Sequence, residues 1–155
     1  MKKITFLVFS LFMVLTSCSD ASFYSKYYDE FPSNHWEKAD KKEFDFTVID
    51  DAKTYDLNLK FGHVYDYQFS IVPIEISIID PAGKEEKLTV DLKIKDENGN
   101  QLAECSGDVC DLIYKIKDKT TLIKGNYKVV VSQAFDQFPY LPNVLGVGLN
   151  VDISK

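Results

Sequence analysis

Two histidines, His35 and His63, are the side chains of this chain best suited to catalysis or metal binding, and they do not have the spacing of a two-histidine metal site. The sequence contains no Gly-x-Ser-x-Gly nucleophile elbow, no phosphate-binding loop and no zinc-protease helix. Its 24 acidic residues could supply a pair of carboxylates for glycoside hydrolysis, but no motif brings two of them together. The sequence therefore predicts a protein that is not an enzyme, with no cofactor, no metal and no small-molecule substrate.

Cys105 and Cys110 form a second group of reactive side chains. Two thiols cannot complete a zinc site without further ligands. In an exported protein we expect a disulfide between them, the alternative being two free thiols in a hairpin. An extended chain would hold the two Cα atoms about 17 Å apart, whereas bridged Cα atoms lie about 4.4–6.8 Å apart. A bridge therefore requires residues 106–109 to turn back, and Gly107-Asp108 suits such a turn.

Cys18 stands at the end of a segment that has the order of a secretory signal. Lys2 and Lys3 precede an apolar run from Ile4 to Leu15, about half the length of a membrane-spanning helix. The sequence Leu15-Thr16-Ser17-Cys18 resembles the lipobox of bacterial lipoproteins. The resemblance implies removal of residues 1–17, diacylation of the Cys18 thiol and acylation of its new amino group. The alternatives are an ordinary signal followed by a chance cysteine, or an uncleaved anchor.

The composition of the mature chain is acidic. Removal of residues 1–17 would leave 138 residues, enough for one domain with a substantial core. These residues would carry 16 lysines and 24 acidic side chains, a formal charge of −8, and the whole sequence contains no arginine. This argues against a nucleic-acid partner, which calls for a basic face and arginine contacts. It also argues against electrostatic binding to an anionic bilayer, so the acyl chains should supply the membrane affinity.

Residues 18–36 are predicted to be a lipidated tether followed by an aromatic segment. Ser19 to Ser22 is small and polar, and its shortness would keep the domain close to its bilayer. The spacing of the aromatic residues that follow fits neither a strand nor a long amphipathic helix. We expect an extended segment laid across the domain, the alternative being an exposed platform for a protein or a glycan. The residues concerned are Phe23, Tyr24, Tyr27, Tyr28, Phe31 and Trp36.

Residues 37–155 alternate apolar and polar side chains over several short runs separated by turn residues, which indicates β-strands. With short connections and no helical periodicity, the pattern predicts an all-β fold, an antiparallel β-sandwich of about seven to nine strands. The alternating runs begin at Phe44, Tyr55, Tyr67, Leu88, Leu112, Tyr127 and Val147.

One of these runs changes its apolar positions partway. Phe69 and Ile71 are followed by Ile74 and Ile76, so the apolar set moves from odd to even numbers across Val72–Pro73. A one-residue slip turns every later side chain to the other face of a strand. We therefore predict a β-bulge or bend at Val72–Pro73, with all four side chains mostly buried.

Asp96 to Asn100 has the Asp-x-Asn spacing with which a calcium-binding loop begins. However, Gly99 arrives two positions early for such a loop, and Gly107 stands where the loop needs a glutamate. The segment is therefore predicted to be a hairpin turn with Gly99 at positive φ.

The longest connection, residues 134–145, is rich in proline and aromatic side chains. Phe138 and Tyr140 lie in it, and together with Trp36 they are the candidate aromatic contacts for a partner. Exposure of all three in one patch would favour a binding module, whereas burial of most of them would favour an accessory structural role.

A set of short motifs spans nearly all of the mature chain. It begins with Trp36, Phe44-Asp45-Phe46 and Tyr55-x-Leu57-x-Leu59, and it ends with Gly125-Asn126-Tyr127, Gln133-Ala134 and Val147-Gly148-Leu149. In this order and spacing the motifs resemble the GldH family of gliding-motility lipoproteins of Bacteroidota, which also carry the lipid signal.

The resemblance implies a membrane-anchored, non-enzymatic accessory component of the gliding motility and type IX secretion apparatus. It implies acyl chains in the membrane, protein partners in the cell envelope and a location at the outer membrane. The alternative is a lipid-tethered β-sandwich that binds a glycan or a protein at the cell envelope.

We expect Cys18→Ala to leave the precursor uncleaved by the lipoprotein signal peptidase and to abolish acylation, because the thiol is the group that receives the lipid. Labelling cells with a fatty acid and isolating the protein measures this directly. Labelling of the variant at the wild-type level would show that Cys18 is not the lipidated residue.

Overall fold

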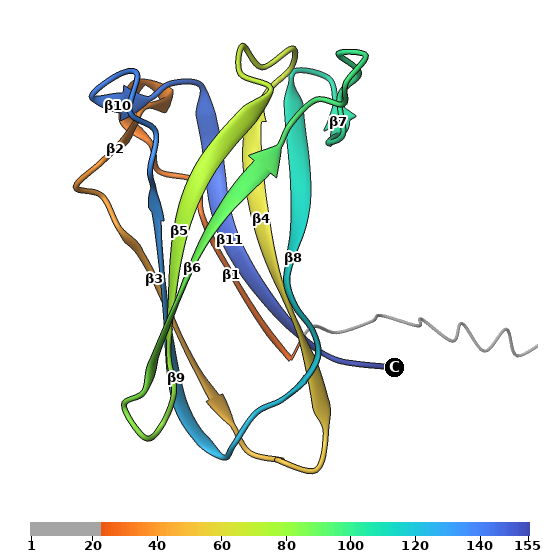
Figure 1. Cartoon of the computed structure of the whole chain (residues 1–155). Coiled ribbons are helices and arrows are strands. Elements are labelled where there is room, and N and C mark those ends of the chain that lie inside the picture. Colours follow the sequence, from red (N-terminus) through yellow and green to blue (C-terminus); the bar gives the residue numbers. More distant parts are fainter. Residues whose placement is uncertain (1–22) are drawn as a thin grey trace, which may run out of the picture.

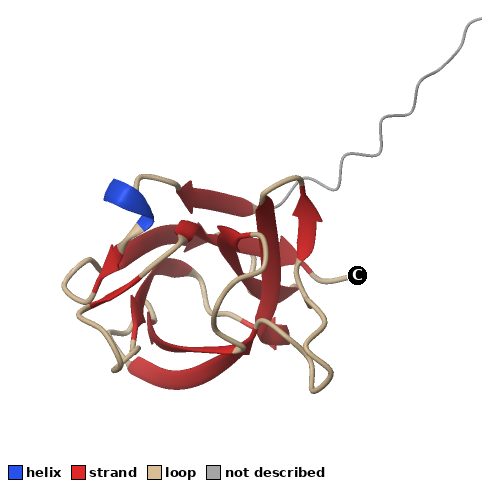
Figure 2. Cartoon of the chain, turned by 90° about the horizontal axis from the view of Figure 1, so that it is seen from above, coloured by secondary structure: helices blue, strands red, loops and turns tan. Residues whose placement is uncertain are grey.

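The computed structural model describes residues 23–155, whose long strands form two antiparallel sheets packed face to face, beside a short two-stranded pair. Figure 1 shows the long strands running together from one end of the molecule to the other, and Figure 2, seen from above, shows them around a common interior. The sheets hold five and four strands, which confirms the predicted all-β sandwich. Cys18 and the predicted signal at residues 1–17 lie outside the described residues.

The five-stranded sheet has β4 at its centre. In order of pairing, its strands are β1 (Tyr24–Tyr28), β11 (Val144–Ile153), β4 (Thr54–Val64), β8 (Val109–Thr121) and β7 (Glu104–Ser106). β1 pairs along β11, from Tyr24 opposite Val151 to Tyr28 opposite Val147. Part of the aromatic segment is therefore an extended edge strand of this sheet.

The four-stranded sheet covers the other side of the interior. Its order is β3 (Lys42–Val48), β9 (Gly125–Gln133), β5 (Ile71–Ile79) and β6 (Glu85–Lys93). A 3-10 turn, η1 (Pro32–Asn34), precedes a short pair formed by β2 (Trp36–Glu37) and β10 (Tyr140–Leu141), which lies at the upper left in Figure 1.

Alternating side chains along the strands fill the interior between the sheets. On β4, Tyr55, Leu57, Leu59 and Phe61 are each 1% exposed, while the residues between them are only partly buried. β3 repeats the pattern with every second residue buried. Each large apolar side chain that is fully buried contributes about 1.5–3 kcal/mol to stability. The period of two seen in the sequence therefore determines which face of each strand meets the core.

The predicted bulge at Val72–Pro73 is wrong. β5 pairs with β6 without interruption from Ile71 to Ile79. Proline is tolerated there because its backbone faces β9, one step past Ile74, where the β5–β9 pairing ends. Pro73 O accepts a hydrogen bond from Ala134 N at 2.9 Å, and no ladder hydrogen bond requires an N–H from Pro73.

The change of apolar face occurs before β5 begins. Ile74 and Ile76 are buried as expected and Phe69 is partly buried, but Ile71 is 48% exposed. The inward side chains are even-numbered along the whole strand, and the odd-to-even change falls in residues 65–70, which are not strand. A loop can change the direction of the side chains without a bulge. The prediction placed the change at Val72–Pro73 because it treated residues 65–70 as part of the strand.

The two long sides of the sandwich are closed by side chains. On one side, Tyr28 Oη and Lys26 Nζ of β1 both donate to the backbone oxygen of Glu43 on edge strand β3, at 2.7 and 3.1 Å. On the other side, an ion pair joins Glu86 of edge strand β6 to Lys117 of β8, beyond the part of β8 that pairs with β7. Charged and hydrogen-bonded edges of this kind hinder pairing with a strand of another chain.

On the outer face of the five-stranded sheet, Tyr27 lies across a surface made by glycines. A Cβ atom at Gly146 would stand 1.9 Å from Tyr27 Oη, one at Gly62 would stand 2.3 Å from the same atom, and one at Gly148 would stand 2.6 Å from Cδ2. Burial, together with the nearby charge of Asp111, raises the pKa of Tyr27 to about 12. The missing side chains let the Tyr27 ring pack directly on the backbone, which holds β1 against β11.

We expect Gly146→Ala to destabilise the fold by about 1–3 kcal/mol, because the added methyl group overlaps the Tyr27 ring and displaces it. In a Tyr27→Ala background the same substitution should cost much less. Urea unfolding of the four proteins in this double-mutant cycle measures the difference. An equal cost in both backgrounds would show that Tyr27 is not the group that requires glycine here.

Candidate functional site

The loops at the C-terminal end of β4 are joined into one surface, which we call the loop end. It lies at the top of Figure 1 and comprises residues 64–70, 94–103, 107–108 and 134–143. Tyr65 N donates to Asp108 O at 2.9 Å, and Val64 N donates to Asn143 O at 3.2 Å. Backbone hydrogen bonds therefore join the start of the loop after β4 to the β7–β8 turn and to the segment before β11.

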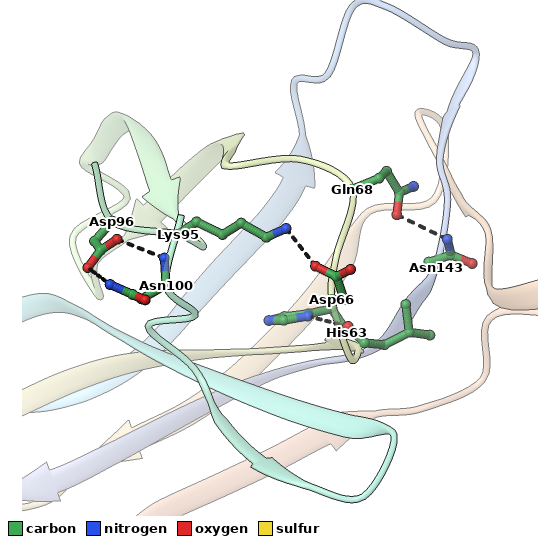
Figure 3. Close-up of polar contacts among 8 residues, drawn as sticks. His63, Asp66, Gln68, Lys95, Asp96, Asn100 and Asn143 are labelled. Atoms are coloured by element: carbon green, nitrogen blue, oxygen red, sulfur yellow. Dashed lines mark hydrogen bonds and ion pairs between the residues drawn. The ribbon is translucent and has the colours of Figure 1, made fainter. Parts of the chain in front are cut away.

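Polar side chains hold this same loop from two directions (Figure 3). Lys95 Nζ lies 2.9 Å from Asp66 Oδ1, and Asn143 Nδ2 donates to Gln68 Oε1 at 3.1 Å. Asp66 has a φ of 52°, a left-handed conformation in which Asp is more common than most residues. Because an exposed ion pair contributes about 1 kcal/mol or less, these contacts position the loop more than they stabilise the fold.

The segment Asp96 to Asn100 forms the predicted hairpin turn, and the Asp96 carboxylate closes it. Asp96 Oδ1 accepts hydrogen bonds from Asn98 N at 2.9 Å and Asn100 N at 2.8 Å, and Oδ2 accepts one from Asn100 Nδ2 at 2.8 Å. These hydrogen bonds, that of the Asn100 side chain foremost, hold the pKa of Asp96 below its ordinary value. Gly99 has a φ of 83°, as the turn requires.

His63 is buried beneath the loop end with one ring nitrogen unsatisfied. Its side chain is 0% exposed, and Nδ1 donates to Val64 O at 2.8 Å, which places the proton of the neutral ring on Nδ1. Nε2 is buried and has no hydrogen-bond partner among residues 23–155. Burial lowers the pKa of His63, against the opposing effects of the Val64 carbonyl and the Asp111 charge. Protonation of Nε2 would therefore place an unpaired charge inside the fold.

Large apolar side chains are exposed around this polar centre. Phe69 packs against Phe135 with ring centroids 4.4 Å apart, and Phe138 stacks on Phe135 at 6.1 Å while remaining 50% exposed. Exposed apolar residues that gather with polar ones at one end of a domain are typical of a protein interaction surface. The exposed apolar residues at or beside the loop end are Tyr65, Ile71, Leu102, Val109 and Phe138.

The three aromatic residues predicted to contact a partner do not form one patch. Trp36 is 0% exposed, and its Nε1 donates to Asp40 O at 2.6 Å, so it belongs to the core. Tyr140 is partly buried and stacks on His35 with ring centroids 3.8 Å apart. Of the three, only Phe138 is exposed. Burial of Trp36 removes it from the candidate contacts, because an aromatic residue in a segment without a period gives no sign of which way it faces.

Cys105 and Cys110 are bonded to each other across the β7–β8 hairpin. They are direct cross-strand partners with Cα atoms 4.0 Å apart, and Gly107 adopts a φ of 61° in the turn between them. Cys110 is buried and lies opposite His63 on the neighbouring strand. The bridge therefore fastens a short edge strand beside the buried histidine.

Two further features of the described residues bear on the chemistry of the surface. Among residues 23–155, no group of three or more His, Cys, Asp and Glu side chains is placed to hold a metal ion. A hollow of about 450 Å³ on the outer face of the four-stranded sheet is lined by charges of both signs, among them Glu43, Glu75, Lys41 and Lys87. Neither the hollow nor the loop end pairs a nucleophile with a base.

The structure shows no helix, over the residues it describes, that is both long enough and apolar enough to cross a membrane.

Sequence reasoning missed the polar residues that fix the loop end, namely Asp66, Gln68, Lys95 and Asn143. Their contacts join positions 29 and 75 residues apart in the chain, and no local pattern encodes such pairs. A usable signal was the concentration of Asp, Asn and Gln in segments between strands, where binding residues gather.

We expect the free energy of unfolding to fall as the pH drops below about 6.5. Below that pH, His63 of the unfolded chain binds a proton, whereas the buried His63 of the folded chain binds one less readily. Since folding lowers this pKa, the contribution is complete above that pH and is lost as the pH falls toward the pKa of the folded state. His63→Gln should lack this component, and His35→Gln should retain it. Urea unfolding between about pH 5 and pH 8 measures both variants. Parallel stability curves for wild type and His63→Gln would contradict the assignment.

Comparison with known proteins places this fold in a family. The family model described as GldH lipoprotein matches residues 23–151, nearly all of the described chain. A gliding motility lipoprotein GldH homolog of Christiangramia forsetii is 28% identical over 155 residues, covering 95% of this chain and 94% of its own. The gliding motility lipoprotein GldH of Flavobacterium johnsoniae is 26% identical over 136 residues, covering 85% of this chain and 81% of its own.

Among solved structures, one of the infectious bursal disease virus Gx strain matches 87% of this chain but only 34% of the viral chain. The sequence identity is 12% and the TM-score 0.29, too low to bear on either fold or function. The family match includes both sheets of the sandwich and the loop end, and on that match this chain belongs to the GldH lipoprotein family.

Proposed function

We propose that this protein is a lipid-anchored, non-catalytic accessory component of the gliding motility and type IX secretion apparatus, held at the outer membrane. The observation that carries the proposal is the family match over residues 23–151, together with two gliding motility relatives aligned over most of their lengths. Lipidation at Cys18 would attach the domain to the membrane. The sandwich then serves as a scaffold that presents a binding surface.

The loop end is the surface best suited to a protein partner. Its backbone is fixed by main-chain hydrogen bonds and by the Lys95–Asp66 contact, so little conformational freedom would be lost on binding. Tyr65 is 59% exposed and Phe138 is 50% exposed, and aromatic residues are enriched in protein interfaces. Lys95 and Asp66 would add polar complementarity beside them.

The alternative, a glycan-binding module, is less favoured by the same side chains. Trp36 is in the core, and one face of the Tyr140 ring is covered by His35. A sugar platform needs an open aromatic face, and of the three candidate aromatics only Phe138 has a largely exposed side chain. Exposed apolar residues distributed around the loop end fit a protein surface better.

We expect the double variant Tyr65→Ser/Phe138→Ser to lose function while remaining at wild-type abundance in the envelope. The test uses a gliding bacterium in which this gene replaces the resident family member. Colony spreading and secretion of type IX cargo into the medium are measured together with protein abundance. Ile113→Ser is the matched control, because Ile113 is 56% exposed on β8 and lies outside the loop end.

Wild-type spreading and secretion in the double variant would contradict the loop end as the binding surface. Failure of the unaltered chain to support either activity would contradict the accessory role itself.

A further inference from the structure

The end of the sandwich opposite the loop end, which we call the anchor end, carries three exposed isoleucines. Ile49 follows β3 and is 72% exposed, Ile123 lies between β8 and β9 and is 52% exposed, and Ile153 ends β11 and is 43% exposed. Isoleucine is among the residues most often buried in folded proteins. Three exposed at one end of a small domain indicate a surface that is covered by something else.

Two of these isoleucines stand on neighbouring turns. Val48 pairs with Gly125, so the turn that carries Ile49 lies beside the turn that carries Ile123. Both turns are at the lower end of Figure 1, where β3 leads into β4 and β8 leads into β9.

The third isoleucine and the start of the described chain lie next to these turns. Ile153 pairs with Tyr55, whose Oη donates to Asp50 O at 2.7 Å in the turn after Ile49. The Phe23 ring packs against the Tyr55 ring with centroids 5.5 Å apart. The chain therefore enters the domain at the anchor end, and Figure 1 shows the start of β1 in the lower part of the view.

The length of chain before Phe23 limits how far the anchor end can be from lipid. Phe23 follows Cys18 by five residue steps, which span about 17 Å when fully extended. β4 has 11 residues and rises about 33 Å from the anchor end to the loop end. A lipid on Cys18 therefore keeps the anchor end near the bilayer surface, whereas the loop end lies a full strand length farther along the domain.

The two lysines in the turns that carry Ile49 and Ile123 are each paired with an aspartate. Lys53 Nζ lies 3.7 Å from Asp50 Oδ2, and Lys124 Nζ lies 3.3 Å from Asp51 Oδ1. Each pair is neutral, and the mature chain is acidic overall, so neither gives a net positive charge that would attract anionic headgroups. Contact with lipid at this end would therefore be apolar and would not require an anionic bilayer.

We propose that the anchor end lies directly on the bilayer, with Ile49, Ile123 and Ile153 entering the headgroup region beside the acyl chains. The inference rests on the proposed lipid anchoring through Cys18 and adds a defined orientation to it. The strands then rise from the membrane, and the loop end faces away from it toward protein partners.

The test uses the lipidated full chain, purified from membranes and placed in vesicles of zwitterionic phosphatidylcholine. Single variants Ile49→Cys and Ile123→Cys carry an environment-sensitive fluorophore, and so do the controls Ile113→Cys and Phe138→Cys. The controls match Ile123 in exposure, at 56% and 50% against 52%, but lie on β8 and at the loop end. The bond between Cys105 and Cys110 leaves no free thiol among the described residues.

We expect a blue shift at positions 49 and 123, with loss of fluorescence when the lipids carry brominated acyl chains, and neither effect at positions 113 and 138. Water-like emission at all four positions on vesicle-bound protein would overturn the inference. Equal quenching at positions 113 and 138 would overturn it as well, because the domain would then have no fixed orientation.

The accessory role is tested separately by spreading and secretion, so its failure is distinguishable from failure of this inference. Protein that leaves the vesicles on sedimentation would overturn the anchoring and this inference together.

Discussion

The burial of alternate side chains along β4 is the constraint on which the rest of the structure depends. β4 is the central strand of the five-stranded sheet, between β11 and β8, and its side chains from Tyr55 to Phe61 alternate strictly between core and outer face. A one-residue slip would expose the whole buried set, at a cost of about 1.5–3 kcal/mol for each large side chain. The registers of β8 and β11, and through β11 that of β1, follow from this strand.

The same alternation carries a histidine into the core. His63 follows Phe61 in the inward set and is completely buried, although its Nε2 finds no partner among the described residues. Buried polar atoms usually have a hydrogen-bond partner. Because the Nε2 atom of His63 has none among the described residues, its burial lowers the stability of the fold. The strand is held by two neighbours and by the bonded Cys110 opposite His63, so the ring cannot turn to solvent without breaking pairing. The alternation of β4 thus places a titratable histidine, His63, directly beneath the loop end.

The sequence predicted the strands and their inward faces, which follow from the period of two. It predicted little of the contacts made by loops. Alternation along residues 44–48, 55–61 and 127–131 identified strands and their inward faces, because a half-buried strand leaves that pattern directly. The same reasoning placed a bulge at Val72–Pro73, because it read alternation across residues 65–70 as if they were strand. The loop-end contacts, such as Asn143 with Gln68, depend on where the sandwich brings distant loops together.

An antiparallel sandwich gathers its turns into two groups separated by the length of its strands. In this chain the two groups differ in chemistry: one combines aromatic and hydrogen-bonding side chains on a fixed backbone, and the other carries isoleucines beside paired charges. The first strand enters at the second group and is held on β11 by the contact of Tyr27 with glycine backbone. In the orientation proposed above, a lipid tether entering there would pull on an edge strand that is paired with β11 from Tyr24 to Tyr28, and not on a loop. With that orientation the sandwich would act as a rigid spacer between the lipid surface and the group of loops proposed to face a partner.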